Sequence, residues 1–171
     1  MPFQSTVSIQ QGFGVPGEQY DDSPVIANTY TIDSASAAYN IIGATCCTVS
    51  SQGFVAAGGT NPFAGFLVNP KVQALYGTGG VPLAPTLTVN NFDIVEVLSM
   101  GTIIVTLPAA AAIGDYVVYN TTTGAISTIT PSTPLASGTA FANAIVVLFT
   151  VSGAGLGVIQ VNPTYIIPQP A

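Results

Sequence analysis

The sequence contains no histidine and no tryptophan, and Lys71 is the single basic residue among its 171 residues. Without histidine, serine–histidine–aspartate and cysteine–histidine catalytic arrangements are excluded. Nucleic-acid binding depends on lysine and arginine side chains that displace counterions from phosphates. Because the net charge is −6, we expect no nucleic acid among the partners of this chain.

Cysteine is also scarce, since Cys46 and Cys47 are adjacent and form the whole complement. Neighbouring cysteines rarely form a disulfide because the resulting ring is strained. Two adjacent thiols without histidine cannot complete a zinc site. In a strand, alternation would point one of these side chains inward and the other outward. We therefore expect two reduced thiols, no metal and no cofactor.

Charge of either sign is rare: 5% of the residues are charged, against about 25% in typical soluble proteins. Soluble monomers normally intersperse charges over their surface, so this composition favours a protein whose exterior is covered by other subunits. Two long uncharged runs, 97–114 and 144–161, are interrupted by glycine, proline or serine and have no flanking lysine or arginine. They are typical of strands rather than of membrane-spanning helices, and we expect no membrane partner.

Short runs rich in Val, Ile, Thr, Tyr and Phe follow one another from Ile32 onward, separated by Gly, Pro, Asn and Ser. This pattern predicts strands, with hairpins over 115–130 and 144–161. The segment 108–114 offers at most one turn of helix. The prediction is an all-β fold, a small barrel or sandwich head over 31–171 with a short proline-containing C-terminal tail. Residues 1–30 have little periodicity and three prolines, which predicts an extended N-terminal arm.

The arm contains Gly12, Gly14 and Gly17, which match the G-x-G-x-x-G pattern of dinucleotide-binding loops. That pattern requires a following helix, and Pro24 would interrupt one. Pro16 lacks the N–H group that should face a phosphate, and the nearby acidic residues would repel the ligand. We therefore expect these glycines to let the chain approach another protein closely.

Acidic pairs leave an enzymatic alternative open. Asp21 with Asp22, or Asp93 with Glu96, could serve glycoside hydrolysis, although solvated carboxylates on an arm and at a strand end explain them more simply. The acids of the arm could also bind calcium, but the EF-hand spacing is absent.

Two segments together carry a resemblance. The arm "QSTVSIQQGFGVPGEQYDDSP" and the later "GDYVVYNTTTGAISTITPSTPLASGTAFANAIVVLFTVSGAGLGVIQV" resemble bacteriophage capsid cement, or decoration, proteins. Members typically carry F-G-x-P-G-E in the arm, then a G-D…T-T-G-A hairpin and a closing G-A-G-L-x-V-I strand. Ala142 stands where the family pattern has proline, and the basic residues usual after that segment are missing.

The resemblance implies a β-barrel-like or β-tulip head that forms homotrimers on the outer capsid surface of the virion, after synthesis in the host cytoplasm. The implied partner is the major capsid protein, which the protein would clamp without enzymatic activity. A tail, baseplate or receptor-interaction module is the alternative within the same class, and a carbohydrate-active β domain is the enzymatic one. The residues expected to contact the shell or a neighbour are Phe13, Val15, Pro16, Glu18, Tyr20, Asp21 and Asp22. Those expected in the head core or oligomer contact are Ile145, Val147, Phe149 and Val151.

Overall fold

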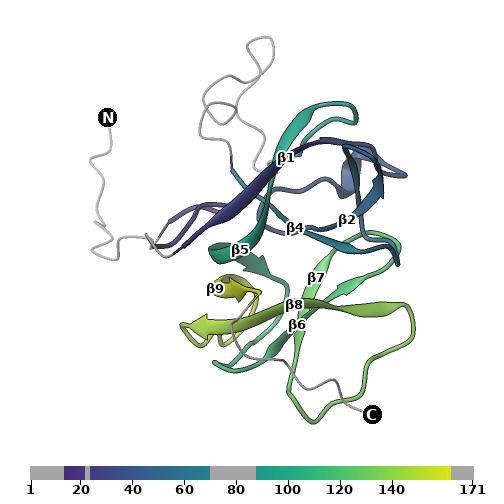
Figure 1. The fold of residues 1–171 in the computed structure, drawn as a ribbon. Coiled ribbons are helices and arrows are strands. Elements are labelled where there is room, and N and C mark those ends of the chain that lie inside the picture. The colour runs from purple at the N-terminus through teal and green to yellow at the C-terminus, as the bar shows by residue number, and fades with distance from the viewer. Residues whose placement is uncertain (1–13, 22–23, 70–87, 163–171) are drawn as a thin grey trace, which may run out of the picture.

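The computed structural model describes residues 14–21, 24–69 and 88–162. Within these ranges the chain forms nine strands and one short 3-10 helix, η1 (Figure 1). The strands are β1 (Ile26–Ile32), β2 (Cys46–Ser51), β3 (Phe54–Ala57), β4 (Phe63–Leu67), β5 (Ile94–Leu107), β6 (Tyr116–Asn120), β7 (Ile126–Ile129), β8 (Thr139–Leu148) and β9 (Gly155–Val161), with η1 at Ala37–Tyr39. The all-β prediction is confirmed. None of the helical residues in the described ranges forms a span that could cross a membrane.

The first half of the fold is a closed five-stranded barrel. Its strands follow the order β1-β3-β2-β4-β5, and β1 pairs with β5 to close the circle. The pairing of β1 with β3 is parallel and involves only Thr31 and Ile32, whereas β1 runs antiparallel to β5 over a longer register. Inside lies the barrel core, which includes Ile32, Cys47, Val55, Leu67, Val95 and Val97.

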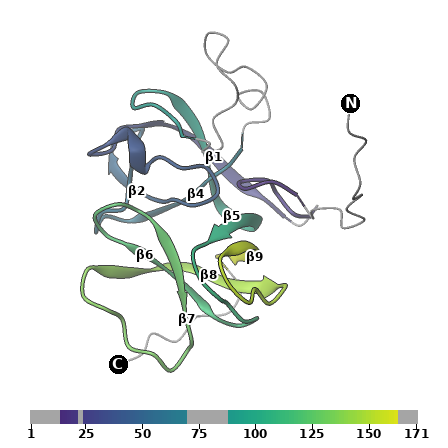
Figure 2. The same ribbon diagram turned by 180° about the vertical axis from the view of Figure 1, so that it is seen from behind.

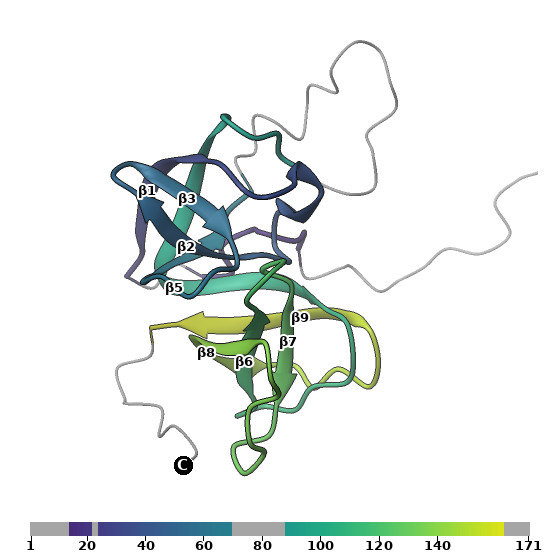
Figure 3. The ribbon, with the colours of Figure 1, turned by 90° about the vertical axis from the view of Figure 1, so that its right-hand side faces the viewer.

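β5 belongs to two sheets, because it is 14 residues long and changes partners at Gly101. Its first half pairs with β1 and β4 in the barrel, and its second half pairs with β9. From there a second sheet continues in the antiparallel order β5-β9-β8-β6-β7. Figure 3 shows β5 running between the barrel and this second sheet, and Figure 2 shows the same two layers from behind.

A second hydrophobic cluster, the interlayer core, fills the space between the barrel and the second sheet. The barrel contributes Cys46, Phe66 and Leu98, which point outward from its wall. The second sheet contributes a larger set: Ile103, Val105, Val117, Val146 and Ile159 among others. Full burial of each large aliphatic side chain contributes about 1.5–3 kcal/mol, so the two layers stabilise each other.

The two cysteines divide between the two cores. Their side chains alternate along β2 as predicted, with Cys47 in the barrel core and Cys46 in the interlayer core. The outward thiol is buried as well, because the second sheet covers this part of the barrel wall. Burial raises the pKa of Cys47 to about 12 and also raises that of Cys46. Both thiols are free and held in the protonated form.

Both predicted hairpins are present. β6 pairs with β7, and β8 pairs with β9, each antiparallel. The turn between β6 and β7 requires glycine at position 124 for two reasons. Gly124 has a φ of 72°, and a Cβ there would stand only 2.6 Å from the backbone nitrogen of Gly58. The turn therefore also fixes the hairpin tip against the barrel.

The barrel begins earlier in the sequence than the predicted head. Residues 26–30, which the sequence analysis assigned to the arm, form most of β1 and pair with β5. Ile26 to Thr29 are exposed, so this part of the strand lacks the apolar alternation that marks a half-buried strand. The division of the chain into arm and head stays a prediction.

Candidate functional site

The described part of the arm, residues 14–21, lies along β5. We call it the docked arm segment. The Gly17 N–H donates to the Ile104 carbonyl at 2.8 Å, and the Ile104 N–H donates to the Glu18 carbonyl at 2.9 Å. The Tyr20 N–H reaches the Thr102 carbonyl at 3.2 Å. The docked arm segment therefore pairs with the second half of β5 on the edge opposite β9.

Two of the three motif glycines lie in this segment, and both are needed for close packing. Gly17 has a φ of 82°, and a Cβ on it would stand 2.8 Å from the Asn69 nitrogen and collide with the Ile42 side chain. Gly14 has a φ of 143°, and a Cβ on it would collide with the Ile104 side chain. Gly12 lies outside the described residues. At Gly14 and Gly17 the close approach is to the protein's own chain.

The barrel side of this contact is formed by Gly43, in the turn before β2. A Cβ on Gly43 would stand 2.6 Å from the Pro16 carbonyl carbon and 2.7 Å from the Pro16 Cβ. On the same side, the Asn69 N–H donates to the Gly17 carbonyl at 2.8 Å. The docked arm segment is thus held between β5 and the loops at residues 43 and 69.

The predicted arm contacts divide into side chains that face solvent and side chains that face the chain itself. Val15 is 49% exposed, and Asp21 is exposed while its carboxylate accepts from the Thr102 hydroxyl. Glu18 accepts from the Val15 N–H at 3.3 Å, and half-buried Pro16 packs at Gly43. The ring of Tyr20 meets Phe149 edge to face at 6.1 Å. Phe13 and Asp22 lie outside the described residues.

The predicted head residues do not share one environment. Ile145 is buried, Val147 is half-buried, and Phe149 is 42% exposed with a φ of 61°. Val151 packs against the interlayer core and exchanges two 2.9 Å backbone hydrogen bonds with Ala111. The residues of β8 in the interlayer core are the alternate set, Ala142, Ala144 and Val146. Because the run is apolar at nearly every position, its sequence does not indicate which face is inward.

Two acidic residues in the described part of the chain accept hydrogen bonds within their own turns. The Asp93 carboxylate accepts from the Asn90 N–H at 3.2 Å, and that of buried Asp115 accepts from the Ala112 N–H at 2.8 Å. Glu96 is exposed on β5. The described ranges contain no group of three His, Cys, Asp or Glu residues that could hold a metal ion.

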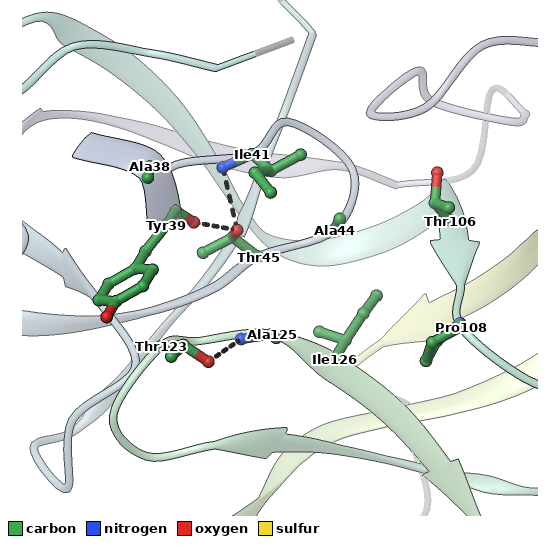
Figure 4. Close-up of a pocket in the computed structure, with 10 residues that line it drawn as sticks. All are labelled: Ala38, Tyr39, Ile41, Ala44, Thr45, Thr106, Pro108, Thr123, Ala125 and Ile126. Carbon is green, nitrogen blue, oxygen red and sulfur yellow. Dashed lines mark hydrogen bonds between the residues drawn. The ribbon is translucent and has the colours of Figure 1, made fainter. Parts of the chain in front are cut away.

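An apolar pocket of about 220 Å³ lies where the barrel meets the β6–β7 hairpin (Figure 4). Its lining includes Tyr39, Ile41, Pro108 and Ile126. The Thr45 hydroxyl donates to the Tyr39 carbonyl at 2.6 Å, and that of Thr123 accepts from the Ala125 N–H at 3.3 Å. The residues that line it carry no carboxylate, thiol or amine, so they offer no nucleophile–base pair.

Sequence reasoning missed two strongly exposed apolar side chains at the start of β5. Phe92 is 70% exposed with a φ of 69°, and Ile94 is 69% exposed. A φ in this region is uncommon for a residue other than glycine, asparagine or aspartate. The signal available in the sequence was the Asn90-Asn91 turn, which presents Phe92 and Ile94 on either side of Asp93.

A protein-family model and two solved structures resemble this chain. A family model described as structural cement protein (E217 gp24/Pam3 gp6) matches residues 3–162. A chain of the capsid of Myoviridae phage XM1 has a similar fold, with a TM-score of 0.58 and 18% identity, over 95% of this chain and 98% of that one. The base of the head fiber gp8.5 of bacteriophage phi29 gives a TM-score of 0.40 and 10% identity, over 81% of this chain and 94% of that one. No curated protein matches the sequence.

Proposed function

This chain belongs to the phage structural cement protein family, and we propose that it is a non-enzymatic cement protein that binds the outer surface of a tailed-phage shell and clamps neighbouring major capsid proteins. The observation that carries the proposal is the family match over residues 3–162, nearly the whole chain. Because the match includes both the docked arm segment and the two sheets, the proposed role belongs to the complete fold.

The chemistry of the described residues supports a structural role. Two carboxylates, those of Asp93 and Asp115, cap their own turns, and the thiols of Cys46 and Cys47 are buried and protonated. The apolar pocket has no charged group in its lining. Catalysis of hydrolysis or group transfer relies on an activated acid, base or nucleophile at an accessible site. The lining of this pocket offers only the hydroxyls of Tyr39 and of threonines, with no carboxylate, thiol or amine beside them to activate them.

The proposed clamp acts through several weak contacts. A homotrimer, which we also propose, would engage several capsid subunits at once, and linked contacts bind more strongly than each would alone because of the raised effective concentration. With a net charge of −6, the chain favours a shell surface that carries basic residues. Val15 and Asp21, two of the three exposed residues of the docked arm segment, would contribute to this contact.

The test is binding of the purified protein to expanded shells assembled from the major capsid protein alone. We expect the protein to sediment with the shells and to raise the temperature at which they fall apart, measured by calorimetry. Electron microscopy of the decorated shells would locate the protein and count its copies per site. A protein that neither sediments with shells nor changes their melting temperature would refute the proposal.

A matched pair of variants tests the arm within the same assay. Val15→Ser removes an exposed apolar side chain from the docked arm segment, and Leu135→Ser removes one from the loop before β8, on the second sheet. We expect Val15→Ser to weaken shell binding and Leu135→Ser to leave it unchanged. If both variants bound shells equally well, the proposal that the arm contacts the shell would be refuted.

A further inference from the structure

β1 has a backbone edge that is only partly paired. The Thr31 N–H donates to the Gly53 carbonyl of the neighbouring turn at 3.0 Å, and β3 pairs only with Thr31 and Ile32. The Ile32 N–H donates on the opposite side, to the Asp93 carbonyl. Since backbone groups alternate along a strand, Ala27 and Thr29 direct theirs away from β5, on the side of β1 that β3 leaves open.

No strand among the described residues pairs with Ala27 or Thr29 on that side. Their recorded partners, Leu98 and Glu96, both lie on β5. We call the outward N–H and C=O groups of Ala27 and Thr29 the open edge of β1. Figure 1 shows β1 extending beyond the rest of the barrel.

This edge lacks the charges and the proline that often protect an edge strand. Natural edges carry charges, proline or a bulge that hinder pairing with another chain. β1 reads IANTYTI, without a charged residue, proline or glycine, and its register against β5 shifts only at its first residue, between Ile26 and Ala27. Ile26 to Thr29 are also exposed. The open edge therefore has both the free hydrogen-bonding groups and the access that strand addition requires.

The surrounding charges indicate what could pair there. Asp21 precedes the strand, Asp33 follows it, and Glu96 lies opposite Thr29 on β5; all three are acidic and exposed. A second copy pairing antiparallel with β1 would bring two such acidic sets together, and like charges facing each other are unfavourable. A basic partner would meet complementary charge.

We propose that the open edge of β1 binds an extended segment of the shell's capsid protein by β-strand addition. The segment would have an uncharged centre that pairs with Ala27 and Thr29 and lysine or arginine near its ends. Exposed Ile94, opposite Thr31 on β5, adds an apolar contact on the outer face of the same ribbon. This inference rests on the proposed function and names the surface that carries it.

Proline substitution tests the edge directly, because proline removes one N–H donor. The Thr29 N–H faces away from β5, so Thr29→Pro leaves the β1–β5 ladder bonds intact, and Ala27→Pro is a second variant of the same kind. Thr128→Pro is the matched control: its N–H faces away from β6, on the same side as that of Ile126, which donates to the Ala44 carbonyl. Asn28→Ala controls for a side-chain effect within β1.

Binding of each variant to shells of the major capsid protein is measured by co-sedimentation, after circular dichroism and thermal unfolding establish that it is folded. We expect Thr29→Pro and Ala27→Pro to bind about tenfold more weakly, the scale of losing backbone hydrogen bonds. Thr128→Pro and Asn28→Ala should bind as the unsubstituted protein does. Equal weakening by Thr128→Pro, or unchanged binding by both β1 proline variants, would overturn the edge proposal.

Hydrogen exchange gives a second readout that needs no substitution. On shell binding, the amides of Ala27 and Thr29 should become protected while that of Thr128 does not. An oligomer in the absence of shells that Thr29→Pro dissociates would identify a second copy as the occupant and refute a capsid segment. If the unsubstituted protein fails to bind shells, the proposed function fails; if it binds with no protection at Ala27 and Thr29, only the edge proposal does.

Discussion

Gly43→Ala separates the contribution of the docked arm segment from the ordinary cost of removing a glycine. Gly43 has a φ of 69°, so any residue with a Cβ is strained there, at a cost of about 1–2 kcal/mol. The new Cβ would also stand 2.6 Å from the Pro16 carbonyl carbon and 2.7 Å from its Cβ. These are backbone and ring atoms, so the arm must move to relieve the overlap.

The expected magnitude follows from what that movement breaks. The docked arm segment makes three backbone hydrogen bonds with β5 and one with Asn69, each contributing about 0.5–1.5 kcal/mol net. Losing two to four of them adds about 1–6 kcal/mol to the strain at Gly43. We expect the free energy of unfolding to fall by about 2–8 kcal/mol in urea titrations.

Gly53→Ala provides the matched control. Gly53 has a φ of 79°, close to that of Gly43, but a Cβ added there would have no atom within 4 Å apart from those of its chain neighbours. It should therefore lose only the conformational contribution of about 1–2 kcal/mol. Limited proteolysis with an enzyme that cleaves after glutamate reports on the arm itself, since Glu18 lies within the docked arm segment. Only Gly43→Ala should accelerate that cleavage, and equal stability loss and equal cleavage in the two variants would refute the arm contact.

Two further predictions concern the arm and the thiols. Removal of residues 1–24 should lower the unfolding midpoint because the hydrogen bonds of the docked arm segment to Thr102 and Ile104 are lost; an unchanged midpoint in thermal unfolding would contradict this. Burial raises the pKa of Cys47 from an ordinary value of 9.0 to about 12 in the folded protein, so the unfolded chain releases this proton first. Stability is therefore full below pH 9 and should fall as pH rises from about 9 toward 12. Titrating the free energy of unfolding of Cys47→Ala beside the unsubstituted protein would test this, because the variant should lose that part of the slope.

The strands and hairpins could be predicted from sequence because local composition determines them. β-branched runs separated by turn residues gave the all-β class, and Gly124 marked a turn whose positive φ only glycine adopts easily. The shared strand was less accessible. Along β5 the exposure alternates from Ile94 to Val97 and then gives way to continuous burial from Gly101 to Val105. This change in exposure near Gly101 accompanies the passage of β5 from one sheet to the other, and the sequence alone did not reveal it.

The candidate site was harder to predict because it depends on backbone. The glycine motif correctly indicated close approach, but sequence alone could not distinguish another protein from the chain's own residues, and Gly43 lies far from Gly17 in sequence. Contact of the arm with a shell stays a prediction. The open edge of β1 left no signal, since free N–H and C=O groups are common to every residue and only pairing distinguishes them.

Edges account for the arrangement of the described chain around β5. Closing the barrel removes edges from its strands wherever pairing is continuous, and the docked arm segment covers the second half of β5 opposite β9. At the far side of the second sheet, the bond from Ile126 to Ala44 partly covers β7. In contrast to these three forms of cover, no described strand pairs with Ala27 or Thr29 on the side away from β5, and β1 carries no charge. Such an edge would be an aggregation hazard in a free protein, which is the physical reason for our proposal that a capsid-protein strand covers it on the shell.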